Sequence, residues 1–448
     1  MELSYEVLIA GAGPAGCAAA YDLARAGRRV LMLDRRTFPR PKACACGLTR
    51  KTLRALRYSV EPVVERVCRE VVLQEAGPRF HEGVRVADKS REVRLQTRKA
   101  ICAMAVRERF DAFCLEQTLA AGAELKKIDG VIAVREFADR VELDVTLADG
   151  SFATLRAAVL IGADGSNGPM RRLWAGLEAQ RERIKGEALK DAAFLESRAA
   201  DVPPEPGWFV RGFALEATVP FDALPAQLPA GDAPQDLVFD FAPIVGGYGW
   251  MFPKGGHINV GIGGFVPREA AREGGDVLCE SVTRALLESY TRTKLGVGLN
   301  EVKAHISGQH LGLGGDRYVP RGRVLLTGDA AGLVDPLTGE GIYSAIKSGQ
   351  AAAGAVMACG AAETGSLSAA YAERLSELQA MLAFSRDAAR SFYREPGRGF
   401  CVVRSRLLRH LMLKTYANGL PHAKLLAGLR ATAKAIAAPR RRGDALVY

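Results

Sequence analysis

The sequence predicts an α/β fold in which an antiparallel β-sheet domain is inserted into a parallel α/β domain, with a helical region at the end. Three observations predict it. A strand, helix and strand pattern opens the chain, alternating apolar segments and Pro-rich loops fill two later stretches, and helical periodicity dominates the last part. With 448 residues, 48% of them hydrophobic and 25% charged, the chain is long enough for two domains with a large core.

The chain opens with a strand, helix and strand unit. Tyr5–Ala10 is predicted to be a buried strand, Pro14–Ala26 a helix, and Arg29–Leu33 a second, parallel strand. A unit of this kind begins many nucleotide-binding sheets.

The turn between the first strand and the helix has the pattern GxGxxG. Gly11 permits a tight turn, Gly13 lets the backbone approach a pyrophosphate, and Gly16 lets the helix pack on the strand. Asp34, 18 residues after the last glycine, is placed to accept hydrogen bonds from ribose hydroxyls. We therefore predict a Rossmann-like dinucleotide-binding domain, whose further contacts in this unit are Pro14, Ala15 and Arg35.

The chain is next predicted to form strands outside this sheet and then to return to it. Residues from Val63 to Gln96 are predicted to form antiparallel strands, and a helix is expected from about Arg109 to Ala121. Strands at Gly130–Val134, Val141–Leu147 and Ala158–Ile161 then lead back to the nucleotide.

Two Gly-Asp turns follow apolar strands. Asp164 and Gly165 come after the strand that ends near Ile161, and Gly328 and Asp329 come at the end of a strand expected at 323–327. Each turn puts a carboxylate at the end of a strand. Either one alone is also compatible with an ordinary turn.

The remaining segments complete two domains and a tail. β-like runs between Pro-rich loops from Trp174 to about Asn300 predict an antiparallel, substrate-covering domain, and a helix of small residues is expected from about Gly341 to Cys359. The expected parts are a nucleotide-binding domain of 1–62, 97–173 and 301–360, a substrate-binding domain of 63–96 and 174–300, and a basic helical C-terminal region of 361–448.

The GxGxxG pattern and the two Gly-Asp turns together resemble the FAD-binding signatures of a flavoprotein group that includes aromatic hydroxylases, halogenases and prenyl reductases. Three further segments are similar to segments of the geranylgeranyl reductase family: DPLTGEGI at 335–342, KACACGLT at 42–49 and YGWMFP at 248–253. In the second of these, Ala45 and Cys46 replace two glycines of the family pattern. The resemblance implies non-covalently bound FAD and a hydrophobic isoprenoid substrate.

The resemblance also implies roles for single residues. Asp329 would contact the ribityl or pyrophosphate part of FAD, and Arg107, in an RxxFD segment, would support the cofactor. No metal site is expected. The other FAD contacts that the resemblance implies are Ala45, Cys46, Gly47, Ala123, Asp164, Gly165, Gly328, Gly339, Gly341 and Ile342.

A prenyl reductase must deliver hydride from reduced flavin to one alkene carbon while a proton reaches the other. By resemblance, Tyr248 and Trp250 would line the substrate cavity over the flavin. Cys44 is the first candidate for tuning the flavin or relaying protons, because its surroundings can shift the pKa of a thiol, and Tyr248 is a second donor. The alternatives are an aromatic core strand and a cysteine that is only a small apolar residue.

Other functions stay open from the sequence. A flavin monooxygenase or halogenase shares the three FAD motifs, although the first tryptophan of the halogenase signature WxWxIP is missing here. A quinone-linked dehydrogenase is disfavoured because no cysteine cluster suits an iron–sulfur centre, and a non-catalytic flavin- or lipid-binding protein is a fourth reading. No second GxGxxG follows a strand, so the expected electron donor is either transient NAD(P)H or a ferredoxin-like protein.

The basic residues of the C-terminal region suggest that the protein binds its substrate at a membrane surface. The net charge is +11, and the segment from Pro396 to Gly443 holds eleven Lys or Arg and no Asp or Glu. Residues 400–413 and 424–436 mix Leu with basic residues, which is typical of amphipathic helices on a membrane surface and also of a helical lid with solvated arginines. No nucleic-acid-binding motif accompanies the charge. Because Met1 runs almost directly into a strand and no apolar stretch is long enough to span a membrane, we expect a cytoplasmic protein, with peripheral contact at the inner face of the membrane.

Overall fold

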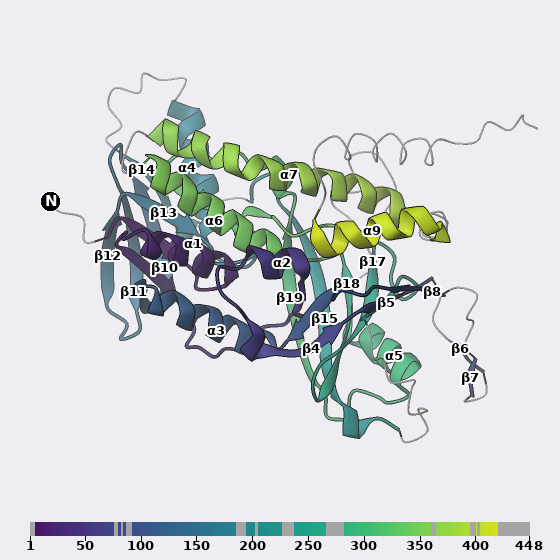
Figure 1. Cartoon of the computed structure of the whole chain (residues 1–448). Helices are drawn as coiled ribbons and strands as arrows, with labels where there is room; N and C mark the ends of the chain where they lie inside the picture. Colours follow the sequence, from purple (N-terminus) through teal and green to yellow (C-terminus); the bar gives the residue numbers. More distant parts are fainter. Residues whose placement is uncertain are drawn as a thin grey trace, which may run out of the picture.

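Two large β-sheets organise the computed structural model of the chain (Figure 1). Parallel strands with helices, an antiparallel sheet and C-terminal helices are all present, so the predicted fold class is confirmed. The structure describes residues 5–75, 79–81, 84–86, 92–184, 194–201, 205–225, 237–265, 282–359, 364–394, 400 and 404–419.

The first sheet has eight strands in the order β12-β11-β10-β2-β1-β13-β20, with β14 paired to β10. Strands β2, β1, β13 and β20 and the start of β10 run parallel, so their carboxyl ends meet at one edge, where the glycine-rich turns lie. The bounds are β1 (Val7–Ala10), β2 (Val30–Asp34), β10 (Glu124–Glu136), β11 (Val141–Leu147), β12 (Phe152–Ala157), β13 (Val159–Gly162), β14 (Leu195–Arg198) and β20 (Val324–Leu326).

Helices cover this sheet. Helix α1 packs against α3 and α6, and α7 packs on the outer side of α6 (Figure 1). Small residues make the contact of α1 with α6 possible, since a Cβ on Gly349 would lie 2.2 Å from the carbonyl oxygen of Ala15. The bounds are α1 (Pro14–Arg25), α3 (Arg107–Ala120), α4 (Met170–Ile184), α6 (Ile342–Cys359) and α7 (Thr364–Arg394).

The second sheet has seven strands in the order β19-β15-β18-β17-β16-β5-β8, all antiparallel except the pair β16 and β5. Because side chains alternate along a strand, one face packs on helix α5 (Arg284–Leu295) and the other faces the first sheet. The bounds are β5 (Glu70–Gln74), β8 (Glu92–Gln96), β15 (Val210–Pro220), β16 (Leu237–Asp240), β17 (Gly247–Pro253), β18 (His257–Gly264) and β19 (His305–Leu313).

Smaller elements join the two sheets. A three-stranded sheet in the order β3-β9-β4 precedes α3 and contacts α6 through β3, and β6 pairs with β7. The bounds are β3 (Gly47–Thr49), α2 (Arg50–Ala55), β4 (Val64–Cys68), β6 (Arg79–His81), β7 (Val84–Val86) and β9 (Cys102–Ala105).

Two places differ from the ranges expected from the sequence. Strand β19 pairs with β15 in the second sheet, although 301–360 was assigned to the nucleotide-binding domain. Strand β14 and helix α4 lie with the first sheet, although they fall within or overlap 174–300. The segment HISGQHLGL of β19 has too many glycines and histidines to show the alternation of a strand. The division into domains stays a prediction.

The C-terminal region folds onto the protein as far as it is described. Helix α9 (Arg406–Asn418) corresponds to the amphipathic helix expected at 400–413, and its Leu413 and Ala417 are buried against the second sheet. Asn418 accepts hydrogen bonds from Arg50 and Arg54 at 2.5 and 3.2 Å. The second helix, expected at 424–436, lies outside the described residues. Among the helices that are described, none is long and apolar enough to cross a membrane.

Candidate active site

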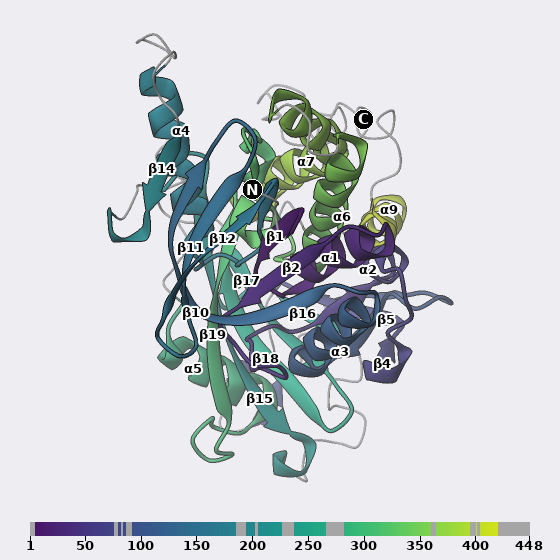
Figure 2. The same cartoon turned by 90° about the vertical axis from the view of Figure 1, so that its left-hand side faces the viewer.

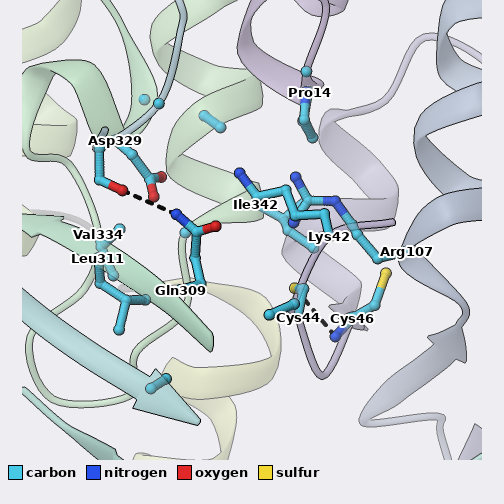
Figure 3. A pocket seen from close by; sticks show the side chains of 18 of the residues that line it. Pro14, Lys42, Cys44, Cys46, Arg107, Gln309, Leu311, Asp329, Val334 and Ile342 are labelled. Carbon is cyan, nitrogen blue, oxygen red and sulfur yellow. Dashed lines mark hydrogen bonds between the residues drawn. The ribbon is translucent and has the colours of Figure 1, made fainter. Parts of the chain in front are cut away.

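A cavity of about 990 Å³ is lined by the carboxyl edge of the first sheet and by one face of the second. This volume is at the upper end of the ~300–1,000 Å³ usual for ligand pockets. Figure 3 shows Lys42 and Cys44 on one side of it and Gln309 and Asp329 on the other. Every site residue predicted from the sequence lines this cavity except Gly16 and Ala123.

The glycine turn forms one end of the cavity. Gly11 has a φ of +108°, and a Cβ there would lie 2.4 Å from the carbonyl oxygen of Ala163 in the neighbouring turn. Gly16 lies behind the lining, where a Cβ would be 1.9 Å from the carbonyl oxygen of Gly11. Gly13 caps α1 without a side-chain hydrogen bond. The first N–H groups of α1 therefore face the cavity as an anion site, with Pro14 and Ala15 beside them.

Asp34 holds this turn in place from the end of β2. Its carboxylate accepts hydrogen bonds from the backbone N–H groups of Ala12 and Arg36, both at 2.8 Å. An ionised carboxylate has about four acceptor positions, so the side chain can still accept from a ribose hydroxyl. Arg35 is exposed at the same edge and also lines the cavity.

Ala123 is not part of the site in this structure. It is buried where β10 begins, and β10 pairs with β2 so that Glu124 lies beside Leu31 and Lys127 beside Asp34. Ala123 is therefore at the amino end of these strands, away from the carboxyl edge. The residues of β10 that do line the cavity come later in the strand, and they were not foreseen from the sequence: Ile128, Gly130 and Val131.

Asp164 serves both the cavity and helix α4. Its Oδ2 accepts a hydrogen bond from the N–H of Met170 at 2.9 Å, whereas no described residue bonds its buried Oδ1. Burial raises the pKa of Asp164 to about 6. The following residue, Gly165, has a φ of +78° and lets the chain turn away from the cavity wall.

Lys42 and Asp329 face the cavity with unused hydrogen-bonding groups. Among the described residues, none accepts a hydrogen bond from Lys42 and none donates one to the carboxylate of Asp329. Burial lowers the pKa of Lys42 and raises that of Asp329, and each charge partly offsets the effect on the other. Asp329 follows Gly328, whose φ is +54°. Polar groups left unpaired beside an anion site fit the polar chain of a dinucleotide.

Buried charges fix the segment from Arg40 to Gly47, which we call the cysteine segment. Arg40 lies 3.2 Å from Oδ2 of Asp111, whose Oδ1 accepts from Nε of Arg107 at 2.6 Å. This network ties the segment to α3. On its other side, Nζ of Lys254 donates to the carbonyl oxygens of Ala45, at 2.8 Å, and Ala105.

Cys44 and Cys46 interact within this segment. The backbone N–H of Cys46 donates to Sγ of Cys44 at 3.3 Å, an interaction drawn in Figure 3. A hydrogen bond from the Cys46 side chain holds the pKa of Cys44 well below its usual range, against the opposing effect of burial, and the Arg107 guanidinium and the Cys46 N–H add to the lowering. The side-chain hydrogen bond with Cys44 and burial raise the pKa of Cys46. Cys44 is half-buried at the cavity, so it carries the more reactive sulfur.

The DPLTGEGI segment forms the wall beside Gly328. Asp335 accepts hydrogen bonds from the N–H groups of Leu337 and Thr338 at 2.9 and 3.1 Å, which closes the turn before Gly339. Glu340 lies 2.7 Å from Nζ of Lys51. This ion pair holds the start of α6, where Gly341 and Ile342 line the cavity.

The far part of the cavity is apolar. Tyr248 donates its hydroxyl hydrogen to the carbonyl oxygen of Thr338, and Nε1 of Trp250 donates to Oδ1 of Asn259 at 2.7 Å. The polar atoms of both rings are thus occupied, and their apolar faces remain for a ligand. We call the six lining rings the aromatic wall: Phe239, Tyr248, Trp250, Phe252, Phe265 and Tyr416 of α9.

One carboxylate on this face was missed in the sequence. Glu216 lines the cavity from β15, and its Oε1 accepts a hydrogen bond from the N–H of Cys44 at 2.8 Å. The alternation of side chains along β15 could have predicted this position. Glu216 stands between Ala214 and Thr218, on the face opposite the apolar residues that pack on α5.

The sequence matches known proteins over most of its length. Residues 4–195 match a family model described as an FAD binding domain. A menaquinone reductase of Mycobacterium tuberculosis is 31% identical over 366 residues, covering 78% of this chain and 76% of the relative. A digeranylgeranylglycerophospholipid reductase of Thermoplasma volcanium is 27% identical over 361 residues, covering 78% and 77%.

Solved structures share the fold. A geranylgeranyl bacteriochlorophyll reductase-like protein from Thermoplasma acidophilum superposes with a TM-score of 0.61 at 20% identity, covering 95% of this chain and 96% of that one. A flavin-dependent brominase superposes with a TM-score of 0.65 at 16% identity, covering 96% and 98%. At these identities the likeness is one of fold, and it extends to enzymes of different chemistry.

Proposed function

Because the chain belongs to the geranylgeranyl reductase family of FAD-dependent oxidoreductases, we propose that it saturates carbon–carbon double bonds of an isoprenoid lipid or a prenylated quinone. The observation that carries this proposal is the continuity of the cavity. The glycine turn at Gly13, the thiol of Cys44 and the aromatic wall line one space. A nucleotide cofactor at one end and an apolar chain at the other would therefore meet beside Cys44.

The residues present fit FAD. The N-terminus of α1 would take the pyrophosphate, Asp34 the adenosine ribose, and Lys42 and Asp329 the polar chain between the two rings. When bound and reduced, FAD supplies the hydride. Arg107 would act by fixing the cysteine segment through Asp111.

The aromatic wall suits an isoprenoid chain. The rings of Tyr248 and Phe265 lie 4.9 Å apart and those of Tyr248 and Trp250 6.0 Å apart, so they form a continuous apolar surface. Binding of an apolar chain there would exclude water and hold one double bond in a fixed orientation. Two relatives act, by their names, on menaquinone and on a digeranylgeranyl lipid, which supports substrates of these two classes.

Electrons would reach the flavin from NAD(P)H or from a ferredoxin-like protein. The choice between these donors is measurable by mixing the oxidised holoprotein anaerobically with NADPH, NADH or a reduced ferredoxin and following the loss of the flavin absorbance.

The function is tested by one anaerobic reaction. The holoprotein is reduced with dithionite and mixed in turn with geranylgeranyl diphosphate, a menaquinone and a digeranylgeranyl lipid, and each product is analysed by mass spectrometry. We expect a gain of two hydrogens per reduced bond, together with reoxidation of the flavin. FAD-free protein is the control. Unchanged substrates, with a product that gains one oxygen only in air and with NADPH, would establish a monooxygenase instead.

A further inference from the structure

The proposed reduction needs an acid, and neither donor suggested by the sequence suits this role. The Cys46 side-chain hydrogen bond and Arg107 hold the pKa of Cys44 well below its usual range, which favours the thiolate over the thiol that an acid requires. Tyr248 has its hydroxyl hydrogen engaged by the carbonyl oxygen of Thr338, and burial raises its pKa further. Neither group readily gives up a proton near pH 7.

Glu216 has the position that an acid requires. It lies in the middle of β15, with Gly261 of β18 and Ser307 of β19 as its cross-strand neighbours, and its side chain is only 8% exposed. Its side chain lines the cavity on the face that also carries the aromatic wall. The hydrogen bond from the N–H of Cys44 fixes the carboxyl next to the cysteine segment.

The surroundings of Glu216 let it exist in both protonation states. Burial raises its pKa to about 7, and the charge on Cys44 acts in the same direction. The Cys44 N–H, Lys254 and Asn259 oppose this effect and stabilise the carboxylate. Trp250 binds Oδ1 of Asn259 and so leaves the amide nitrogen free to donate to Glu216.

We propose that Glu216 is the catalytic acid of this site. The assignment rests on the proposed function. The alkene π electrons would form a C–H bond with the proton of the Glu216 carboxyl, while the hydride completes the second C–H bond. Glu216 is left as a carboxylate, held by the Cys44 N–H, and then takes a proton from water. Two hydrogens are added and no further oxidant or reductant is needed.

The test compares Glu216→Gln with wild type in single-turnover reactions. Glutamine keeps an oxygen that can accept from the Cys44 N–H, so the fold and FAD binding should persist, which the flavin spectrum and dithionite titration would show. We expect the rate of alkene saturation to fall about a hundredfold or more, with the half-saturating substrate concentration unchanged. The wild-type rate should decline as pH rises through about 7, because the protonated carboxyl is required, and the variant should lack this decline.

Two controls separate the possible failures. Glu196→Gln, on β14 and outside the cavity lining, should behave as wild type. Glu216→Asp should keep the pH dependence at an intermediate rate. In FAD-free protein, infrared difference spectra should show a carboxyl that titrates near pH 7 in wild type and is absent in Glu216→Gln.

Two results would overturn the assignment. One is a Glu216→Gln variant within about threefold of wild type with the same pH profile, and the other is an Asp variant as slow as the Gln variant. In both cases an active wild type would leave the proposed function standing. A wild type that saturates none of the three substrates would instead remove the proposed function, and the assignment with it.

Discussion

At the scale of single residues, both the side chain and the backbone of Cys46 influence the chemistry of Cys44. Cys46 has a φ of +49°, in the left-handed region where glycine is usual, and it stands where the family pattern has glycine. This conformation points the N–H of Cys46 at Sγ of Cys44. This N–H adds to the larger effect of the Cys46 side-chain hydrogen bond, so the buried Cys46, whose own pKa is raised, stabilises the thiolate of Cys44.

This arrangement predicts selective alkylation. In FAD-free protein, Cys44 should react with iodoacetamide near pH 7, below the usual thiol pKa of about 8.5, because the thiolate persists until the pH falls through the lowered pKa of the folded state. Peptide mass spectrometry measures the extent at each described cysteine, and bound FAD should protect Cys44. Cys44→Ser serves as the control. An unreactive Cys44 below pH 8 would contradict the lowered pKa.

Most cavity residues were predictable because they belong to local patterns. Gly11, Gly13 and Asp34 act through one βαβ unit, so their spacing in the sequence is also their geometry. The alternation of β15 could have placed Glu216 on the cavity face, but its contact with Cys44 was not predictable, because the two residues are 172 positions apart. Ala123 was expected at the site from a motif, whereas the register of β10 places it at the wrong end of the sheet.

At the scale of elements, the sequence predicted those with strong periodicity and missed those held by tertiary contacts. The buried run VLIA of β1 and the small-residue pattern of α6 were recognised. Helix α5 was missed because it lies in a stretch rich in β-like runs, and it is held mainly by its contact with the second sheet. Strand β19 is likewise defined by its partner β15.

The contact of α5 with its sheet predicts a large stability effect. Nζ of Lys294 on α5 lies 2.5 Å from Oδ2 of Asp240 on β16, and the two side chains are 3% and 1% exposed. Asp240→Ala would leave the ammonium buried, with Gln74 as a neutral partner, and should lower the free energy of unfolding by about 3–5 kcal/mol. Urea unfolding measures this.

The matched control for this buried ion pair is an ion pair on the surface. Asp139 lies 3.1 Å from Arg140 with its side chain 75% exposed, so Asp139→Ala should cost less than about 1 kcal/mol. Equal effects of the two substitutions would show that the α5 ion pair does not contribute as its burial implies.

At the scale of the whole molecule, charge is concentrated in the C-terminal region. Eleven basic residues and no acidic ones lie between residues 396 and 443, in a chain whose net charge is +11. In the described part of this region, α9 packs on the protein as a lid over the aromatic wall, to which it contributes Tyr416 (Figure 2 shows α9 beside α2). Packing of α9 on the protein is compatible with membrane contact, because further basic residues follow α9 in the sequence.

This charge distribution predicts salt-dependent binding to anionic vesicles. The full chain should bind phosphatidylserine-containing vesicles at low salt, and not purely zwitterionic ones, with affinity falling as salt screens the charge. Replacing Arg440, Arg441 and Arg442 by Gln should weaken binding about a hundredfold, at about 1 kcal/mol per basic residue. Sedimentation with vesicles measures it, and binding that ignores salt or lipid charge would refute an electrostatic contact.

The position of α9 also has a consequence for the order of assembly on the ribosome. Every residue that lines the cavity except Tyr416 has been synthesised once the chain reaches Ala345, whereas Tyr416 of α9 follows much later in the sequence. At about 5–20 residues per second, this leaves an interval of seconds in which the residues expected to bind the nucleotide have been synthesised and α9 has not. During that interval the aromatic wall lacks Tyr416, the ring that α9 contributes to it.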